Sequence, residues 1–315
     1  MVHRIVAVLL LLCAPVLAAS SDLQSKLQDM AAKHHGKVAL FAKKLQTGET
    51  VAIDADTPVQ TASVIKLPIM VEAMHQVKDG KLKLDQRLRL TKDNQVPGSG
   101  VLPFLMPGLD LTLDDTITLM MILSDNTATN MTIDAVGIPN VNKRIETMGL
   151  KNTYLYKKVY KPAEGPMPAD QKKFGLGKTT AREMATVMES VQRCELNDAA
   201  LCKRMIEIMR NQQYRNMIPH YIETVDTSET PSAIADKIGA LDAARNDVAL
   251  VFTKSGPLVI SIFTYENKDQ SWIPENEAEL LIARMAKLIV DTWGPQLRTG
   301  EAVIPDEKVA PKPHD

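Results

Sequence analysis

The sequence predicts an α+β fold in which an antiparallel sheet is flanked by two terminal helices and interrupted by an inserted all-helical lobe. Two observations predict it. Strand-like segments rich in β-branched residues occur before residue 55 and again between residues 232 and 266. From about Thr61 to Tyr221 the apolar residues follow the helical period instead.

This order of elements divides the chain into two lobes. Residues 20–60 and 222–294 are expected to form an α/β lobe, and residues 61–221 an all-α lobe. Residues 295–315 are polar, which predicts a flexible C-terminal tail.

The first 19 residues have the pattern of a signal peptide. A basic start, MVHR, precedes the apolar run IVAVLLLLCAPVLA, which ends in small residues at Val16 and Ala18. The apolar run is short for a membrane span. We therefore expect residues 1–19 to be removed and the protein to be exported, either periplasmic or secreted; an uncleaved membrane anchor is the alternative.

Each flanking element has a sequence signature. A helix is predicted from Ser21, followed by a hairpin of KVALFAKKL and ETVAID joined by QTG. Three further strands, SAIADKIGA, DVALVFT and LVISIFTYE, follow the helical lobe. The segment PENEAELLIARMAKLIVDTWGP predicts a last helix that begins at Pro274.

Within the helical lobe two segments differ from the rest. The segment TLDDTITLMMIL is apolar nearly all round, which predicts a central buried helix. Residues 151–178 lose the helical period and are rich in Lys, Pro and Gly. A loop of this length predicts a functional role.

Charge and cysteine content exclude several classes of partner. The net charge of −1 comes from scattered charges, so we expect neither nucleic acid nor membrane binding after signal removal, and we expect a monomer. No histidines have metal-ligand spacing, so no metal or cofactor is expected. Once Cys13 leaves with the signal, Cys194 and Cys202 remain, which predicts a disulfide, with two free thiols as the alternative.

Three short motifs at the junction of the lobes carry candidate chemistry. They are Ser63-x-x-Lys66, Ser124-Asp125-Asn126 and Lys237-Ile238-Gly239. A separation of three puts Lys66 on the same helical face as Ser63. A lysine that is partly desolvated beside other cations can lose its proton and act as a base for a serine nucleophile.

The motifs resemble those of the class A β-lactamases and the wider penicillin-recognising serine hydrolases, S-x-x-K, S-D-N and K-T/S-G. Five segments resemble family segments in the family's order, between about residues 23 and 293: TASVIKLPI, PGSGVL, MILSDNTATN, GLGKTTAREMA and ADKIGALDAARNDVALV. The resemblance implies a β-lactamase/transpeptidase-like fold. It also implies hydrolysis of the β-lactam amide through an acyl-enzyme on Ser63, without metal or cofactor.

The resemblance also implies roles for the other motif residues. Ser124 would relay a proton to the leaving nitrogen, and Asn126 would bind the substrate's side-chain amide. Lys237 and Gly239 would belong to the substrate-binding strand, with Lys237 holding the substrate carboxylate. The backbone N–H groups of Ser63 and Ala240 would form the oxyanion hole, typically worth about 3–4 kcal/mol per donor.

The third motif departs from the family pattern. Ile238 stands where the family has Thr or Ser and cannot donate a hydrogen bond, an interaction worth about 1.5–3 kcal/mol to a charged group. Arg245 is a candidate to bind the substrate carboxylate in its place, with a surface position as the alternative. Lys254-Ser255-Gly256 matches the motif better, but it lies between two apolar segments as a hairpin turn would, so Lys237 is preferred.

The loop between residues 151 and 178 lacks the family signature R-x-E-x-x-L-N, whose glutamate activates the deacylating water. Glu164 is the only glutamate of this loop and is the candidate base, with Asp170 second. Loss of such a base would slow turnover by about a hundred- to ten-thousand-fold and leave acylation possible.

Three functions therefore stay open. The first is a class A β-lactamase type of hydrolase, acting on small β-lactams. The second is a D-Ala-D-Ala peptidase with slow deacylation, acting on a peptidoglycan stem peptide. The third is a β-lactam sensing domain that acylates once.

Overall fold

The computed structural model describes residues 21–224 and 230–300. Its centre is a five-stranded antiparallel sheet in the order β2-β1-β10-β9-β8. Strand β1 pairs with β10 along its whole length, so the two ends of the chain share one sheet. The strands are β1 (Lys37–Lys44), β2 (Thr50–Ile53), β8 (Ile234–Leu241), β9 (Ala244–Thr253) and β10 (Gly256–Tyr265). The predicted α+β class is confirmed.

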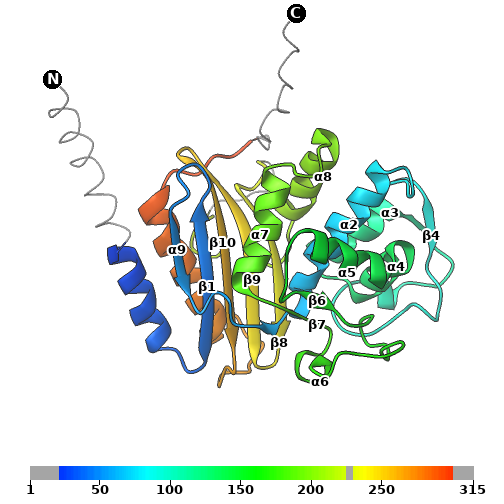
Figure 1. Cartoon of the computed structure of the whole chain (residues 1–315), viewed down its shortest axis with the longest axis horizontal. Coiled ribbons are helices and arrows are strands. Elements are labelled where there is room, and N and C mark those ends of the chain that lie inside the picture. The colour runs from blue at the N-terminus through cyan, green and yellow to red at the C-terminus, as the bar shows by residue number, and fades with distance from the viewer. Residues whose placement is uncertain (1–20, 225–229, 301–315) are drawn as a thin grey trace, which may run out of the picture.

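Helices cover both faces of this sheet (Figure 1). The N-terminal helix, described over 21–32, and α9 (Glu277–Trp293) pack on one face through a shared apolar cluster. Helix α7 (Ala181–Gln192) contacts β1, β9 and β10 from the other face. Strand β9 is consequently buried at every position, as a strand covered on both sides should be.

Helix α9 begins three residues later than Pro274, the predicted start. The side chain of Asn276 accepts hydrogen bonds from the backbone N–H groups of Ala278 and Glu279. An asparagine at this position satisfies N–H groups that have no partner inside the helix, so it sets the boundary.

Besides α7, the described helical part contains five longer helices and several short elements. The helices are α2 (Lys66–Lys78), α3 (Leu113–Ile122), α4 (Asn126–Val136), α5 (Ile138–Thr147) and α8 (Ala199–Arg210). The short elements are η1 (Ala62–Ile65), η2 (Leu102–Phe104), α6 (Gln171–Phe174) and a two-stranded sheet of β4 (Arg87–Arg89) and β5 (Asp110–Thr112). Figure 1 shows them gathered beside the sheet.

The most buried helices are α2 and α4, and not α3, which was predicted to be central. Half of α3 reaches solvent, where Asp114 forms an ion pair with Arg204. Helix α4 is polar in sequence but tolerates burial, because Thr129 and Thr132 donate their hydroxyls to backbone carbonyls of the preceding turn. The pattern of apolar residues alone therefore did not predict which helices are the most buried.

The loop over 151–178 is partly ordered by backbone pairing. Strands β6 (Tyr154–Leu155) and β7 (Gly177–Thr179) pair with each other, and β7 also pairs with β3 (Val59–Gln60) just before η1. The Asn130 side chain donates to the carbonyl of Val159 and accepts from its N–H. The loop is thereby tied to both α4 and the segment that precedes Ser63.

The predicted disulfide is confirmed. Cys194 and Cys202 join the end of α7 to the start of α8. The predicted signal peptide, residues 1–19, and residues 301–315 of the predicted tail lie outside the described residues. Over the described ranges, none of the helices has the length and apolarity that crossing a membrane requires.

The start of α3 offers a test of the local helix signals. Thr112 accepts a hydrogen bond from Asp115 N, and the Asp115 side chain accepts one from Thr112 N. Thr112→Ala should lower the free energy of unfolding by about 1 kcal/mol, because one N–H loses its partner. Urea unfolding measures this, with Thr112→Ser as the control that should keep most of the stability. Equal losses in both variants would contradict the capping role.

Candidate active site

Ser63 occupies an unusual position in the chain. It lies in η1, directly before α2, and it is the one residue between 61 and 74 that is not buried. The preceding Ala62 has φ of 45°, a left-handed conformation that costs energy in a residue with a Cβ. Strain of this kind persists where the surrounding structure imposes it. At this position the strained backbone leaves the Ser63 hydroxyl partly exposed.

Lys66 is completely buried and reaches the second motif. Its Nζ donates to the backbone carbonyl of Ser124 at 2.7 Å, to Ser124 Oγ at 3.1 Å and to Asn126 Oδ1 at 3.1 Å. Among the described residues, Ser63 Oγ accepts and donates no hydrogen bond. The expected Ser63–Lys66 pair therefore shares a helical turn, while the Lys66 amine is oriented towards Ser124.

Lys237 approaches the same hydroxyl from the sheet. Its Nζ lies 3.0 Å from Ser124 Oγ and donates to the carbonyl of Ile238 at 2.7 Å. Ser124 has φ of 52°, a second strained non-glycine conformation. The structure thus brings together the three predicted motifs, with the Ser124 hydroxyl between two lysine amines.

The two amines have strongly perturbed protonation. Burial lowers the pKa of Lys66 well below its usual range, and the charge of Lys237 lowers it further. Burial also lowers the pKa of Lys237 to about 7, although Asp236 and Asp247 raise it. Desolvation disfavours a charged amine, so a neutral lysine is accessible here near neutral pH.

The Asp125 side chain anchors the segment that contains Ser124. This buried side chain caps α4 through the N–H of Ala128 and accepts from the N–H groups of Val101 and Leu102. Gly100 allows this approach, because a Cβ there would lie 2.2 Å from Asp125 Cγ. The middle residue of the motif is therefore an anchor for the loop around residue 100.

Gly239 is required by close backbone packing. A Cβ at this position would lie 2.8 Å from the N atom of Ser63 and 2.9 Å from the carbonyl oxygen of Thr61. The next residue, Ala240, is partly exposed at the end of the buried part of β8. Strand β8 and η1 thus lie in direct contact, with the N–H of Ser63 beside the strand.

Asn246 is a site-forming residue that the sequence did not reveal. From β9 its Nδ2 donates to the carbonyls of Gln60 and Thr61, which precede the nucleophile. It lies opposite Gly239 in the strand pairing. Asn246 therefore fixes the distance between β8 and η1, and the RND sequence was its only signal.

Ile238 faces away from the lysine cluster. Its side chain is almost completely buried in the apolar cluster that also contains Leu281 of α9. Successive residues of a strand point to opposite faces, so Lys237 points to the site and Ile238 to the core beneath α9.

The predicted substrate-binding role of Arg245 is contradicted. Arg245 is fully buried, its Nε bonds Glu279 at 2.9 Å, and its Nη2 donates to Ser271 O at 2.8 Å. Its guanidinium stacks on Trp272, with Cζ 4.4 Å from the ring centroid. The nitrogens of the guanidinium all have protein partners, so Arg245 joins β9 to the start of α9. The alternative of a surface position is also wrong.

The predicted bases of the loop are not brought to the cluster. The Glu164 side chain is 81% exposed, and its carboxylate lies 3.8 Å from Lys158 Nζ. Asp170 accepts from Lys178 Nζ and from the Tyr156 hydroxyl, each at 2.7 Å, and these bonds lower its pKa. Neither carboxylate has a hydrogen bond to Ser63, Lys66 or Ser124.

Other residues of the loop lie closer to the site. Val159 is held by Asn130 through both backbone groups. A Cβ built on Gly98 would lie 2.5 Å from Asn126 Nδ2 and 3.2 Å from Cε2 of Tyr160, so the Tyr160 ring and Asn126 flank the same glycine. The part of the loop next to the second motif thus carries Val159 and Tyr160, neither of which is a carboxylate base.

Over residues 21–224 and 230–300, no group of three or more His, Cys, Asp or Glu side chains is arranged to hold a metal ion. The groups that this site offers are the hydroxyls of Ser63 and Ser124 and the buried amines of Lys66 and Lys237.

The fold and this cluster define a penicillin-recognising serine hydrolase. The chain belongs to the β-lactamase enzyme family, whose sequence profile matches residues 22–293. The resemblance expected from the motifs is thus confirmed.

Two known proteins have similar sequences. β-Lactamase CARB-3 of Pseudomonas aeruginosa is 26% identical over 297 residues, which cover 92% of this chain and 97% of the relative. A β-lactamase regulatory protein, BlaB of Streptomyces cacaoi, is 27% identical over 137 residues, or 42% of this chain and 43% of the relative.

Solved structures have the same β-lactamase/transpeptidase-like fold. A β-lactamase from Sphaerobacter thermophilus has a TM-score of 0.71 and 27% identity, over 88% of this chain and 95% of the other. A variant of PBP-A in its acyl-enzyme complex with penicillin G has a TM-score of 0.73 and 23% identity, over 86% and 96%, which supports the fold alone.

Two buried carboxyls, Asp236 and Asp247, lie close enough to Lys237 to raise its pKa. Burial raises the pKa of Asp247 to about 7, and burial together with Asp247 raises that of Asp236 well above its usual range. Asp247 Oδ2 accepts from the N–H of Ile218 at 2.9 Å. Among described groups Asp236 has no hydrogen-bond partner for either oxygen. The folded state therefore favours protonated carboxyls here.

Asp247→Asn should separate this effect from packing. The folded pKa of about 7 exceeds the usual 3.8. The contribution of this carboxyl to the stability of the wild type is therefore fully present below pH 3.8 and is lost as pH rises through 7. Asparagine cannot ionise and keeps an acceptor for Ile218. The unfolding free energy of Asp247→Asn, relative to that of the wild type, should therefore increase as the pH rises from about 4 to about 8. The exposed Asp85→Asn is the control, and an advantage that is constant with pH would refute the raised pKa.

Proposed function

We propose that the protein is an exported serine hydrolase of the class A β-lactamase type, which opens the β-lactam amide through an acyl-enzyme on Ser63. The observation that carries this proposal is the convergence of Lys66 and Lys237, both fully buried, on the hydroxyl of Ser124, with Ser63 one helical turn before Lys66. Membership of the β-lactamase enzyme family supports it.

In acylation, neutral Lys66 takes the proton of Ser63 as Oγ attacks the amide carbon. The backbone N–H groups of Ser63 and Ala240 hold the oxyanion, since β8 and η1 lie in contact at Gly239. Breaking of the C–N bond sends its electron pair to nitrogen, which receives the Ser124 proton. The proton on Lys66 then restores the Ser124 hydroxyl through their 3.1 Å hydrogen bond.

Two residues recognise the substrate in this proposal. Lys237 binds the substrate carboxylate, and an anion beside it favours its charged form despite burial. Asn126 offers its amide to the substrate side chain, although in the free protein its Oδ1 accepts from Lys66 and its Nδ2 donates to Pro97. Ile238 supplies no hydrogen bond, which weakens carboxylate recognition by about 1.5–3 kcal/mol relative to a hydroxyl.

For deacylation, neither of the two candidate carboxylates of the loop is hydrogen-bonded to Ser63, Lys66 or Ser124. The loop places Tyr160 near Asn126 and Val159 against Asn130, while Glu164 is exposed to solvent. We therefore propose that hydrolysis of the acyl-enzyme is the slow step. The same observation is the one that favours a D-Ala-D-Ala peptidase acting on a peptidoglycan stem peptide as the second candidate.

We also propose that export removes residues 1–19 and that the mature protein acts as a monomer, divided into the α/β and all-α lobes at residues 61 and 221. The signal pattern supports export, and a disulfide between Cys194 and Cys202 requires an oxidising compartment.

Intact mass spectrometry after mixing with benzylpenicillin tests the acylation step. A penicilloyl adduct should appear on the wild type and not on Ser63→Ala. Lys66→Ala should form it about a hundred- to ten-thousand-fold more slowly, because a general base is lost. Arg284→Gln, an exposed change on α9, should acylate normally. Absence of any adduct and of any hydrolysed product on the wild type would refute the proposal.

The same measurement over time tests the loop. Glu164→Ala should release the adduct at the wild-type rate, because the Glu164 carboxylate is exposed and bound only by Lys158. Asp170→Asn serves as a comparison, since its bonds to Tyr156 and Lys178 order the loop. If Glu164→Ala extended the adduct lifetime a hundredfold or so, Glu164 would be the base after all.

A further inference from the structure

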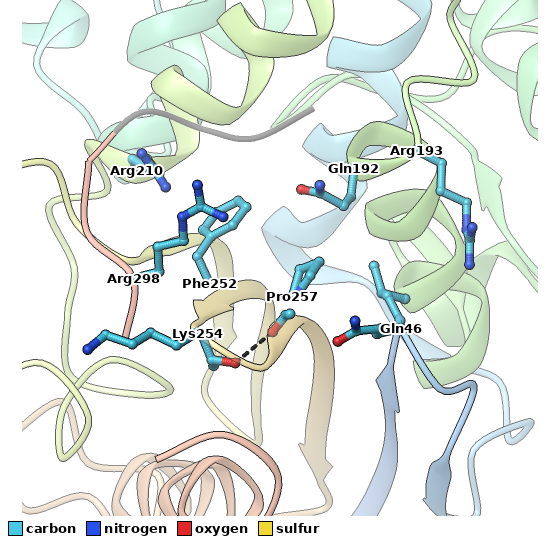
Figure 2. Close-up of a pocket in the computed structure, with 11 residues that line it drawn as sticks. Gln46, Gln192, Arg193, Arg210, Phe252, Lys254, Pro257 and Arg298 are labelled. Carbon is cyan, nitrogen blue, oxygen red and sulfur yellow. Dashed lines mark hydrogen bonds between the residues drawn. The ribbon is translucent and has the colours of Figure 1, made fainter. Parts of the chain in front are cut away.

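A cavity of about 430 Å³ lies away from the catalytic cluster (Figure 2). It forms where the β9–β10 turn meets the ends of α7 and α8 and the segment after α9. Lys237 pairs with Val248 of β9, and Thr253 in the cavity wall lies five residues further along that strand. At about 3.3 Å per residue the two sites are roughly 17 Å apart along β9.

The charge of the lining is unbalanced. Four cationic side chains line the cavity and no carboxylate does: Arg193, Arg210, Lys254 and Arg298. Arg193 has a partner in Glu189. Within the part of the chain that the structure describes, the other three form no ion pair.

Arg210 is the most informative of these residues. It is 7% exposed, and its guanidinium stacks on Phe252 with Cζ 4.5 Å from the ring centroid. One nitrogen, Nη1, donates to the carbonyl of Gly300. Nε is buried and has no hydrogen-bond partner among the described residues. Burial lowers the pKa of Arg210, although the charges of Glu223 and Glu207 raise it. A buried guanidinium that forms no ion pair is costly, and an anion in the cavity would reduce that cost.

Backbone hydrogen bonds fix the wall that carries Lys254 and Arg298. After α9 the chain returns along the end of β9, where Lys254 N donates to Gln296 O and Arg298 N donates to Phe252 O, each at 2.8 Å. Leu297 forms a β-bridge with Thr253. Figure 2 shows Arg298 next to the Phe252 ring, on the same side of the cavity as Arg210. The turn that supplies Lys254 is Lys254-Ser255-Gly256, the unused copy of the third motif.

We propose that this cavity binds a small organic anion with two negative charges, a phosphate monoester or a dicarboxylate, whose apolar group packs against Phe252 and Pro257. Arginine forks match planar carboxylate and tetrahedral phosphate oxygens in two-point contacts. The cavity volume suits a small ligand. This inference does not depend on β-lactam hydrolysis.

Calorimetric titration of the full-length protein with phenyl phosphate tests the site. At about pH 8 this probe is a dianion. One molecule should bind per chain, more tightly than inorganic phosphate, and added salt should weaken binding. Arg298→Gln should weaken it by about tenfold or more, because a hydrogen bond between charged groups is lost. The exposed Arg284→Gln is the matched control and should bind as the wild type does.

Arg210→Gln should abolish binding, and its circular dichroism spectrum and thermal unfolding report whether it remains folded. Phenylsuccinate in place of phenyl phosphate distinguishes a dicarboxylate ligand from a phosphate ester. Failure of both probes to bind, or binding that Arg298→Gln leaves unchanged, would overturn the site. Inorganic phosphate binding as tightly as phenyl phosphate would overturn the apolar part of the proposal.

Discussion

The hydrogen bonds from two buried lysines to one serine hydroxyl are the constraint around which the structure is organised. Lys66 comes from a helix and Lys237 from the sheet, so Ser124 Oγ joins the two parts of the fold. Neither amine has any exposed surface. Placing two amines in a dry interior costs stability, and it gives each a lowered pKa that an exposed lysine would lack.

Two polar side chains keep these groups in place. Asp125 holds the Ser124 segment against the loop near residue 100, and Asn246 holds the start of η1 against the sheet. Both bind backbone groups of the segments that they hold. The Asp125 charge also raises the pKa of Lys66, against the larger effect of burial. Asp236 and Asp247 act in the same direction on Lys237.

Sequence reasoning succeeded for features that depend on residues close together in the chain. It predicted that Ser63 and Lys66 share a helical turn, that β9 and β10 form a hairpin, and that Cys194 and Cys202 form a disulfide. It failed where burial is decided by distant segments. Arg245 was assigned to the substrate because nothing in the sequence reveals Glu279 and Trp272 around it. Glu164 had suitable spacing, but the Asn130–Val159 contact presents a different part of the loop to the site.

The Cys194–Cys202 disulfide has a consequence for production of the protein. It closes a ring of few residues, since the two positions are 8 apart in sequence. In the chain-entropy treatment so short a ring contributes about 2–3 kcal/mol, a minor share of what holds a large core together. A leaderless version made in a reducing cytosol would therefore fold without the bridge, and gentle oxidation after purification would restore the lost resistance to heat.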